Sequence, residues 1–236
     1  MSKVLAIDTS SFVLGVAIMD GERVLGEIVT NSKKNHALRL MPAISKLMEE
    51  LKVAPKELER IVVANGPGSY TGVRIGVTTA KTLAWSLNIP LVMVSSIEVM
   101  AQAGRFYPDK IVPLIDARRG QVYTGLYEAY EDEVKPLGSD KLVLLSDWLN
   151  VLKAEGDSVL FVGQDVELHR DVIVEALGDK ANFAPVSVQL PRPTELGLLG
   201  QKKEVEADVH VVTPQYLQLA EAEAKWKAAQ EGKSHD

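Results

Sequence analysis

Two stretches of the sequence share one pattern, and together they constrain the fold more than any other feature. Residues 6–18, AIDTSSFVLGVAI, and residues 114–127, LIDARRGQVYTGLY, each contain an apolar run ending in Ile-Asp, a short polar segment and an alternating strand with a glycine. The spacing differs, since Asp8 precedes Gly15 by seven residues and Asp116 precedes Gly125 by nine. The similarity is either chance or a repeat, and a repeat predicts two duplicated domains that each open with a β-turn-β unit.

The first half of the chain alternates between strand and helix patterns. Asp20-Gly21 is a strong hairpin signal between two apolar strands. Residues 36–51 have apolar side chains at helical spacing, with Pro42 either kinking the helix or marking a later start. The predicted elements are strands at 4–8, 13–19, 23–30, 61–64 and 91–94 and helices at 36–51 and 71–87. This order predicts an α/β half with a mixed sheet.

The second half shows a similar alternation. We predict strands at 111–116, 121–129, 134–143 and 159–162, and helices at 146–153, 165–177 and 193–202. Ser146 is the expected N-cap of the first of these helices, and Gly178 is expected to close the second. Residues 220–236 favour a solvated helix that frays into a disordered tail. We therefore expect domains at 1–106 and 107–213, with residues 214–236 returning to the first domain.

Composition excludes several classes of protein. The chain has 236 residues and no cysteine, which excludes disulfides, cysteine nucleophiles and thiolate metal sites and suits the cytoplasm. No apolar run approaches the roughly 18 residues of a membrane span, and the N-terminus is typical of a first strand rather than a signal peptide. The net charge of −6 gives no broad basic footprint for nucleic acid, so a nucleic-acid role would need a basic partner.

The glycine-rich segment GPGSYTGVRIG, residues 66–76, lies where phosphate-binding loops occur. It lacks the Gly-Lys of a Walker motif and the third glycine of a dinucleotide fingerprint. Ser69 or Thr71 can cap the following helix, whose N-terminus attracts anions, and Arg74 could pair with a phosphate or carboxylate. The alternative is a tight structural turn followed by an ordinary N-cap.

Two helices carry more apolar surface than one sheet face needs. Small residues recur every four positions in residues 71–87, and residues 36–51 are apolar over more than one stripe. These helices are either fully buried within their domain or form a subunit interface. The interface prediction comprises His36, Leu40, Met41, Ile44, Gly72, Gly76, Ala80 and Ala84.

Polar residues at the ends of two predicted strands are candidates for nucleotide binding. Asp8 and Asp116 could orient a metal-bound phosphate, and Ser10 could contact it. The alternative is that these polar residues only stabilise ordinary turns. Arg118 and Arg119 stand where a second phosphate loop would have glycines, which favours contact with an anion or a partner. The four histidines are isolated in sequence, so we expect no metal site.

Four ordered motifs together resemble one family. These are AIDTSS, the HALRLMPAI run at 36–44, GPGSYTGVRIG, and DARRGQVY at 116–123. They are similar to the TsaB family, also called YeaZ, over about residues 1–127 and more loosely afterwards. Residues 214–217, PQYL, resemble the family's PxYLR ending, except that Gln218 replaces the usual basic residue.

The resemblance implies a duplicated actin-like fold of the sugar kinase, Hsp70 and actin type, which is ribonuclease H-like, with mixed sheets flanked by helices. It implies a non-catalytic subunit for threonylcarbamoyl transfer to adenosine 37 of ANN-reading tRNAs, acting with the TsaD transferase and the TsaE ATPase. ATP and metal are expected on those partners, tRNA is expected to bind through the complex, and a homodimer can form without a partner. In the family, the first two long helices make the dimer interface.

One segment distinguishes this chain from its catalytic relatives. TsaD proteins carry an HLEGH metal motif after the corresponding helix and strand, whereas this chain has Ser96 and Met100 in place of the two histidines. Neither side chain is a good substitute for imidazole on a hard or borderline metal. We therefore expect no enzyme activity from this chain alone. The alternatives are a small-molecule kinase or ATPase that uses Asp8, and a metal-dependent glycoprotein endopeptidase.

Overall fold

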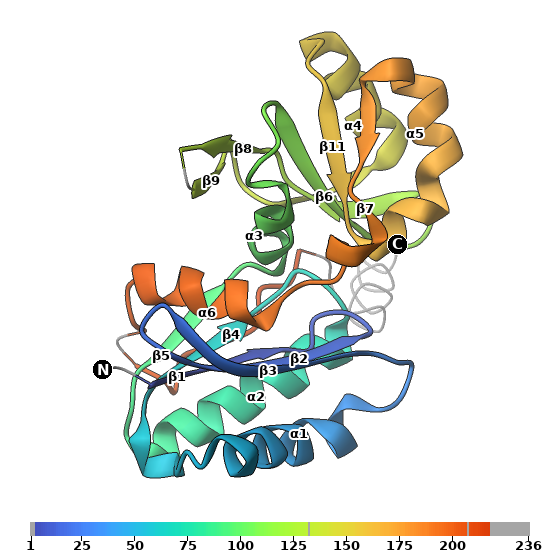
Figure 1. The fold of residues 1–236 in the computed structure, drawn as a ribbon. Coiled ribbons are helices and arrows are strands. Elements are labelled where there is room, and N and C mark those ends of the chain that lie inside the picture. Colours follow the sequence, from blue (N-terminus) through green and yellow to red (C-terminus); the bar gives the residue numbers. More distant parts are fainter. Residues whose placement is uncertain (1–2, 132, 207, 218–236) are drawn as a thin grey trace, which may run out of the picture.

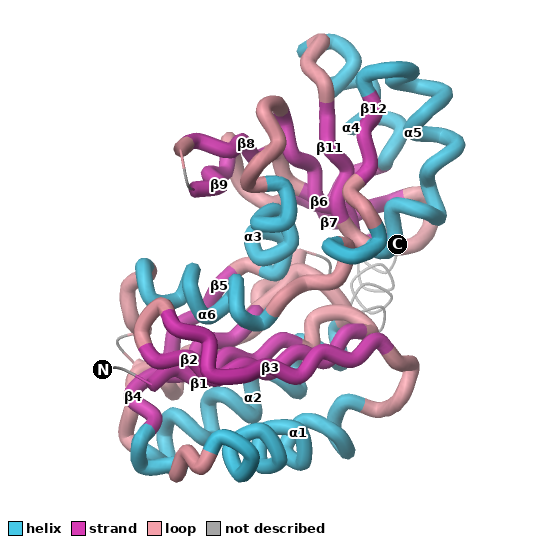
Figure 2. The backbone as a smooth tube through the Cα atoms, viewed as in Figure 1, coloured by secondary structure: helices cyan, strands magenta, loops and turns pink. Residues whose placement is uncertain are grey.

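The structure is a computed structural model that describes residues 3–131, 133–206 and 208–217. Two α/β halves, each a mixed sheet flanked by helices, lie one above the other in Figure 1 and Figure 2. The helix and tail predicted at 220–236, and Gln218, lie outside the described residues. Within the described part of the chain, no helix combines the length and the apolarity that crossing a membrane requires.

The first half is built on five strands in the order β3-β2-β1-β4-β5. The strands are β1 (Lys3–Asp8), β2 (Val13–Asp20), β3 (Arg23–Asn31), β4 (Leu58–Ala64) and β5 (Leu91–Val94). β1 to β3 form an antiparallel meander, and β4 and β5 add to β1 in parallel. All five predicted strands are confirmed, with β4 starting three residues earlier than expected.

Alternation along β1 decides which helices cover which face of this sheet. Leu5 and Ile7 pack in one core with α1 (His36–Leu51) and α2 (Tyr70–Leu87). Val4 and Ala6 point to the opposite face, where α6 (Pro193–Lys202) supplies Leu196. Pro42 lies inside α1, which runs through it from His36.

The second half contains a seven-stranded sheet with the main order β10-β7-β6-β11-β12. Its strands are β6 (Lys110–Asp116), β7 (Gln121–Thr124), β8 (Tyr127–Tyr130), β9 (Glu133–Pro136), β10 (Lys141–Leu144), β11 (Val159–Val162) and β12 (Ala181–Phe183). One face packs on α4 (Leu145–Glu155) and α5 (Arg170–Leu177). The other face packs on α3 (Ser96–Ala101).

Four predictions for the second half are wrong in detail. The strand predicted at 121–129 is divided at residues 125–126, because β7 pairs with β10 whereas β8 pairs with β9. The strand predicted at 134–143 is likewise divided, between β9 and β10. Ser146 is not the N-cap of α4, since Leu144 takes that position without a side-chain hydrogen bond. The helix predicted at 165–177 begins as a 3₁₀ segment, Gln164–His169, before α5. Gly178 closes it as expected.

The two halves share one topology, which supports the repeat. In each half the central strand pairs with an antiparallel strand on one side and a parallel strand on the other, and each of these pairs with one further strand. In this arrangement β1 corresponds to β6. Each half ends in a helix that crosses to the other: α3 follows β5 but covers the second sheet, and α6 follows β12 but covers the first.

The position of α6 corrects the expected domain limits. The sequence predicts residues 193–202 in the second domain, but Gly200 packs so tightly on Val62 of the first sheet that an added Cβ would lie 2.3 Å from its side chain. The following segment also runs along the first half, where the Gln215 N–H donates to the Asn65 carbonyl over 2.8 Å. The chain thus returns to the first half at Pro193, where α6 begins, about 20 residues before the expected return at residue 214.

Candidate functional site

A cleft of about 1150 Å³ lies between the two halves. It is lined on one side by the turn after β1 and the start of α2, and on the other by the turn after β6 and the 3₁₀ segment Gln164–His169. Residues 215–217 complete it. Of the predicted site residues, the cleft brings together Ser10, Ser69, Thr71, Asp116 and Arg118.

Asp8 lies behind the cleft, beneath the turn that follows β1. Its side chain is 1% exposed, and its Oδ1 accepts hydrogen bonds from the Ser10 N–H at 2.9 Å and the Ser10 hydroxyl at 2.7 Å. Oδ2 is buried with no hydrogen-bond partner. Burial raises the pKa of Asp8, and the two hydrogen bonds from Ser10 oppose that rise. The Asp8 carboxylate therefore organises the turn and does not line the cleft.

Asp116 ends the corresponding strand of the second half and faces a different environment. Its Oδ1 lies 3.0 Å from the His169 Nε2, and its N–H donates to Asp165 Oδ2 over 3.0 Å. Burial is the main cause that raises the pKa of Asp165. The Arg118 N–H donates to Asp116 Oδ2 over 3.3 Å. This arrangement holds the Asp116 carboxylate, which lines the cleft, against the His169 imidazole.

Sequence reasoning missed His169 and Asp165. The sequence shows His169 as an isolated histidine, since it forms no HxxxH or HExxH pattern, and its partner Asp116 is 53 residues away. The only available signal is the repeat itself, which predicts that β11, like β4, lies beside the first strand of its half. The segment after β11 is therefore expected beside Asp116, and it contains both residues.

The glycines of GPGSYTGVRIG allow α2 to approach the turn after β1. A Cβ on Gly68 would lie 2.2 Å from the Ser10 carbonyl oxygen, and a Cβ on Gly72 would lie 2.1 Å from that of Thr9. The Ser69 N–H donates to the Ser10 carbonyl over 2.7 Å, and the Ser69 hydroxyl caps α2 by accepting from the Gly72 N–H at 3.3 Å. These contacts favour the structural interpretation of the segment.

The predicted interface residues are mostly buried within the chain. The small-residue stripe of α2 faces inward, and on α1 Leu40 and Ile44 lie in the core. The assignment of these six residues to a subunit interface is therefore wrong: Leu40, Ile44, Gly72, Gly76, Ala80 and Ala84. Gly72 and Gly76 allow the close approach of α2 to Thr9, whose hydroxyl donates to the Gly72 carbonyl over 2.8 Å, and the other four residues pack in the core of the first half. His36 is half-buried and bonds the Ser11 carbonyl, and Met41 is exposed.

Arg74 lies beside the cleft on the exposed side of α2. Its guanidinium stands 5.3 Å from the centre of the Tyr70 ring and donates to the Tyr70 hydroxyl over 3.0 Å. Tyr70 in turn stacks on Tyr216 with ring centres 4.9 Å apart. Arg74 thus extends an aromatic stack at the cleft rim, whereas Arg118 lines the cleft itself.

The segment that aligns with the metal motif of the catalytic relatives carries structural contacts. The Ser96 side chain accepts a hydrogen bond from the Gly66 N–H over 3.2 Å, and Ser96 is 1% exposed. Met100 packs in the apolar core between α3 and the second sheet. Within the described ranges, no group of three or more histidine, cysteine, aspartate and glutamate side chains is placed to hold a metal ion.

Comparison with known proteins identifies the family. A model of the TsaD family, described as tRNA N6-adenosine threonylcarbamoyltransferase, matches residues 23–226. TsaB of Bacillus subtilis, named a tRNA threonylcarbamoyladenosine biosynthesis protein, is 51% identical over 96% of this chain and 99% of that protein. The chain belongs to the TsaB family. TsaB of Escherichia coli is 29% identical over 56% of this chain and 58% of that protein.

Solved structures confirm the fold predicted from the sequence. YeaZ from Pseudomonas aeruginosa matches with a TM-score of 0.75 and 27% identity, covering 92% of this chain and 100% of that one. Component A of (R)-2-hydroxyglutaryl-CoA dehydratase from Acidaminococcus fermentans matches with a TM-score of 0.50 at 10% identity, over 86% of this chain and 98% of that one. The second likeness shows the fold alone. Both support the duplicated actin-like architecture.

Proposed function

We propose that this protein is a non-catalytic scaffold subunit needed for threonylcarbamoyl transfer to adenosine 37 of ANN-reading tRNAs. It acts with a TsaD-type transferase and a TsaE-type ATPase. Those partners hold the metal and ATP, and tRNA binds through the complex in the cytoplasm. Its membership of a family whose relatives are named for threonylcarbamoyladenosine biosynthesis supports the pathway.

The observation that carries the non-catalytic role is that Ser96 and Met100 have structural roles at the positions where the catalytic relatives have metal-binding histidines. In this chain the first bonds the backbone of Gly66 and the second fills a core. Restoring a metal site would require two histidines where one side chain is fully enclosed and the other is packed against the second sheet. The partner transferase is therefore the expected source of metal-dependent chemistry.

The partner surface is the exposed side of α1 and α2. Leu38 is 76% exposed, Met41 46% and Trp85 64%, although all three are large apolar side chains. The two helices lie side by side on the outer face of the first sheet in Figure 1. A surface of this kind is typical of a protein interface, with an aromatic side chain as an anchor. Without the transferase, the same face can join two copies of this chain.

The experiment measures threonylcarbamoyladenosine in tRNA after depletion of this protein, followed by complementation with variants. We expect the nucleoside to be lost on depletion and restored by the parent sequence. The double variant Leu38→Glu/Trp85→Glu should fail to restore it and should weaken association with the transferase by roughly 30-fold for each lost anchor, because a buried interface anchor contributes about 2 kcal/mol.

A matched control is Val151→Glu on α4, since Val151 is 46% exposed on a helix of the second half. It should leave both association and complementation unchanged. An unchanged level of threonylcarbamoyladenosine in depleted cells would contradict the proposed function.

The cleft supports one alternative, a small-molecule kinase or ATPase. Its volume of about 1150 Å³ is large enough for a nucleotide, and Ser10, Ser69 and Asp116 line it. Asp8, however, is enclosed behind its turn and cannot hold a metal-bound phosphate without movement of that turn. Turnover of ATP by the purified chain, lost on Asp116→Asn, would favour this alternative over the scaffold.

A further inference from the structure

The two helices that exchange halves meet behind the cleft. α3 packs on the second sheet through Ile97 and Met100 but contributes Val99 to the core of the first half, where α6 supplies Leu196. In Figure 1 α3 stands directly above α6, between the two sheets. Any change in the angle between the halves must therefore move these helices relative to each other or to a sheet.

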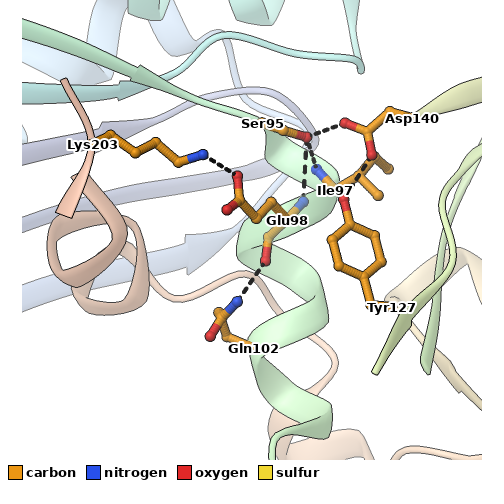
Figure 3. Close-up of polar contacts among 7 residues, drawn as sticks. All are labelled: Ser95, Ile97, Glu98, Gln102, Tyr127, Asp140 and Lys203. Atoms are coloured by element: carbon orange, nitrogen blue, oxygen red, sulfur yellow. Dashed lines mark hydrogen bonds and ion pairs between the residues drawn. The ribbon is translucent and has the colours of Figure 1, made fainter. Parts of the chain in front are cut away.

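A chain of hydrogen bonds crosses this junction, as Figure 3 shows. The Ser95 hydroxyl caps α3 by accepting from the N–H groups of Ile97 at 3.1 Å and Glu98 at 3.3 Å. The same hydroxyl donates to Asp140 Oδ2, and the Tyr127 hydroxyl donates to Asp140 Oδ1 over 2.7 Å. Ser95 follows β5 of the first sheet, whereas Tyr127 and Asp140 belong to the second half.

The Tyr127 hydroxyl remains a donor in this arrangement. Tyr127 is 1% exposed, and burial, followed by the charge of Asp140, raises the pKa of its hydroxyl. A hydrogen bond from a buried neutral donor to a carboxylate is among the stronger ones in proteins. Asp140 thus joins the cap of α3 to the second sheet through both of its oxygens.

Ion pairs fasten the other side of the same junction. Lys203, just after α6, lies 2.8 Å from Glu98 of α3, and Glu195 of α6 pairs with Arg105 beyond α3. The side chains of Glu98, Arg105 and Glu195 are each less than 30% exposed, so water screens these pairs only in part. Both pairs connect a helix packed on the first sheet to a segment packed on the second.

We propose that this junction, with Asp140 at its centre, is a lock that holds the two halves at one fixed angle and thereby sets the width of the cleft. Two-domain proteins can close around ligands by hinge motion, in which a few loop or element-terminal residues absorb the change in backbone angles. Here the place where the chain crosses between halves carries a continuous set of directional contacts. This inference stands independently of the proposed scaffold role.

The test uses the absence of cysteine in the chain. Phe12→Cys and Leu168→Cys place two spin labels on opposite sides of the cleft, since both residues line it and are 55% and 71% exposed. Pulsed electron resonance then measures the distribution of distances between the halves in the full chain. We expect one narrow distribution in the labelled parent.

The lock variants are Tyr127→Phe, Asp140→Ala and Lys203→Met in that labelled background. Loss of a contact to a charged group should increase the share of a second distance population about tenfold, most strongly in Asp140→Ala. Tyr130→Phe is the matched control, because Tyr130 lies in the same hairpin but is 55% exposed, and it should keep the parent distribution.

Three results would overturn the proposal. One is a broad or two-population distribution in the parent, and another is an equal effect of Tyr130→Phe and Tyr127→Phe. The third is an unchanged narrow distribution in every lock variant that folds, as judged by circular dichroism. If Asp140→Ala does not fold, Tyr127→Phe and Lys203→Met decide the outcome, because both retain the packing of the junction.

Discussion

The turns after β1 and β6 occupy equivalent places in the repeat but have opposite character. In the first, Asp8 is buried and bonds its own neighbour Ser10, and α2 covers the turn so closely that Gly68 and Gly72 have no room for a side chain. In the second, Asp116 faces the cleft and bonds His169 from a distant segment.

This difference shows how a duplicated framework can assign separate tasks to its halves. The first turn is closed by a helix and serves to fix α2, whose outer face carries the proposed partner surface. The second turn leaves Arg118 and the Asp116 carboxylate at the cleft wall, with the carboxylate held by His169. The second turn therefore presents polar groups that a ligand can contact, whereas the first turn mainly fixes the position of α2.

The largest expected effect breaks the closed turn. Gly72→Ala should lower the free energy of unfolding by about 3 kcal/mol, because the new Cβ would lie 2.1 Å from the Thr9 carbonyl oxygen and the backbone must move. Gly120→Ala, in the open turn, meets no atom within 4 Å, but Gly120 has a φ of +72°, so the loss should be about 1 kcal/mol. Urea unfolding measures both.

Gly138→Ala is the control for this pair. It has open space and no positive φ, and the expected change is within about 0.5 kcal/mol. Equal losses for Gly72→Ala and Gly120→Ala would show that the two turns do not differ in packing.

The second prediction concerns the pH dependence that buried Asp8 creates. Its pKa is raised in the folded protein, so the unfolded chain releases the proton at lower pH than the folded one. Stability therefore falls as pH rises from the unfolded pKa of about 3.9 through the folded pKa. Asp8→Asn removes this loss, by about 1.4 kcal/mol for each unit of elevation.

Urea unfolding of Asp8→Asn and the parent across this pH range isolates the contribution of Asp8. The difference in unfolding free energy, variant minus parent, should become more positive with increasing pH. The contribution of Asp165, whose pKa is also raised, is common to both proteins and cancels. A difference that is constant with pH would contradict burial as the cause.

A smaller effect is expected from the pair that characterises the open turn. Asp116 and His169 are 26% and 16% exposed in their side chains, and the atoms lie 3.0 Å apart. A double-mutant cycle with Asp116→Asn and His169→Ala should give a coupling energy of about 0.5–1 kcal/mol at neutral pH, since water screens part of the interaction. A coupling energy of zero would show that the two side chains are merely adjacent.

Local patterns predicted the first half well because each of its strands is bounded by a signal in the neighbouring sequence. Asp20-Gly21 makes the hairpin, and apolar alternation assigns the faces of β1. The second half was predicted less accurately because tertiary pairing divides its strands: β8 leaves the path of β7 to pair with β9. The destination of α6 was missed for a similar reason, since a helix pattern does not state which sheet will receive it.

The same distinction applies to the candidate site. Ser10, Ser69 and Arg118 were predicted because they lie next to recognisable turns. His169 depends on a contact over 53 residues, which no local spacing reveals. The small-residue stripe was recognised, but its partner was assigned wrongly, because a flat helix face looks the same whether it meets a turn of its own chain or another subunit.

The smallest expected effect tests why the open turn keeps an arginine in a strained conformation. Arg118 has a φ of +66°, whereas no residue of the first turn, 9–12, has a positive φ. A left-handed conformation costs a non-glycine residue about 1 kcal/mol, and glycine removes this strain. Glycine also raises the conformational entropy of the unfolded chain, which offsets part of the gain. Arg118→Gly should therefore stabilise the protein by about 0.5 kcal/mol in thermal or urea unfolding, whereas Arg118→Ala, which keeps the strain, should not. A loss of stability in Arg118→Gly would mean that the guanidinium supports the fold. A gain would mean that Arg118 is kept at the cleft at the expense of stability. Strained residues of this kind often contact a ligand or a partner.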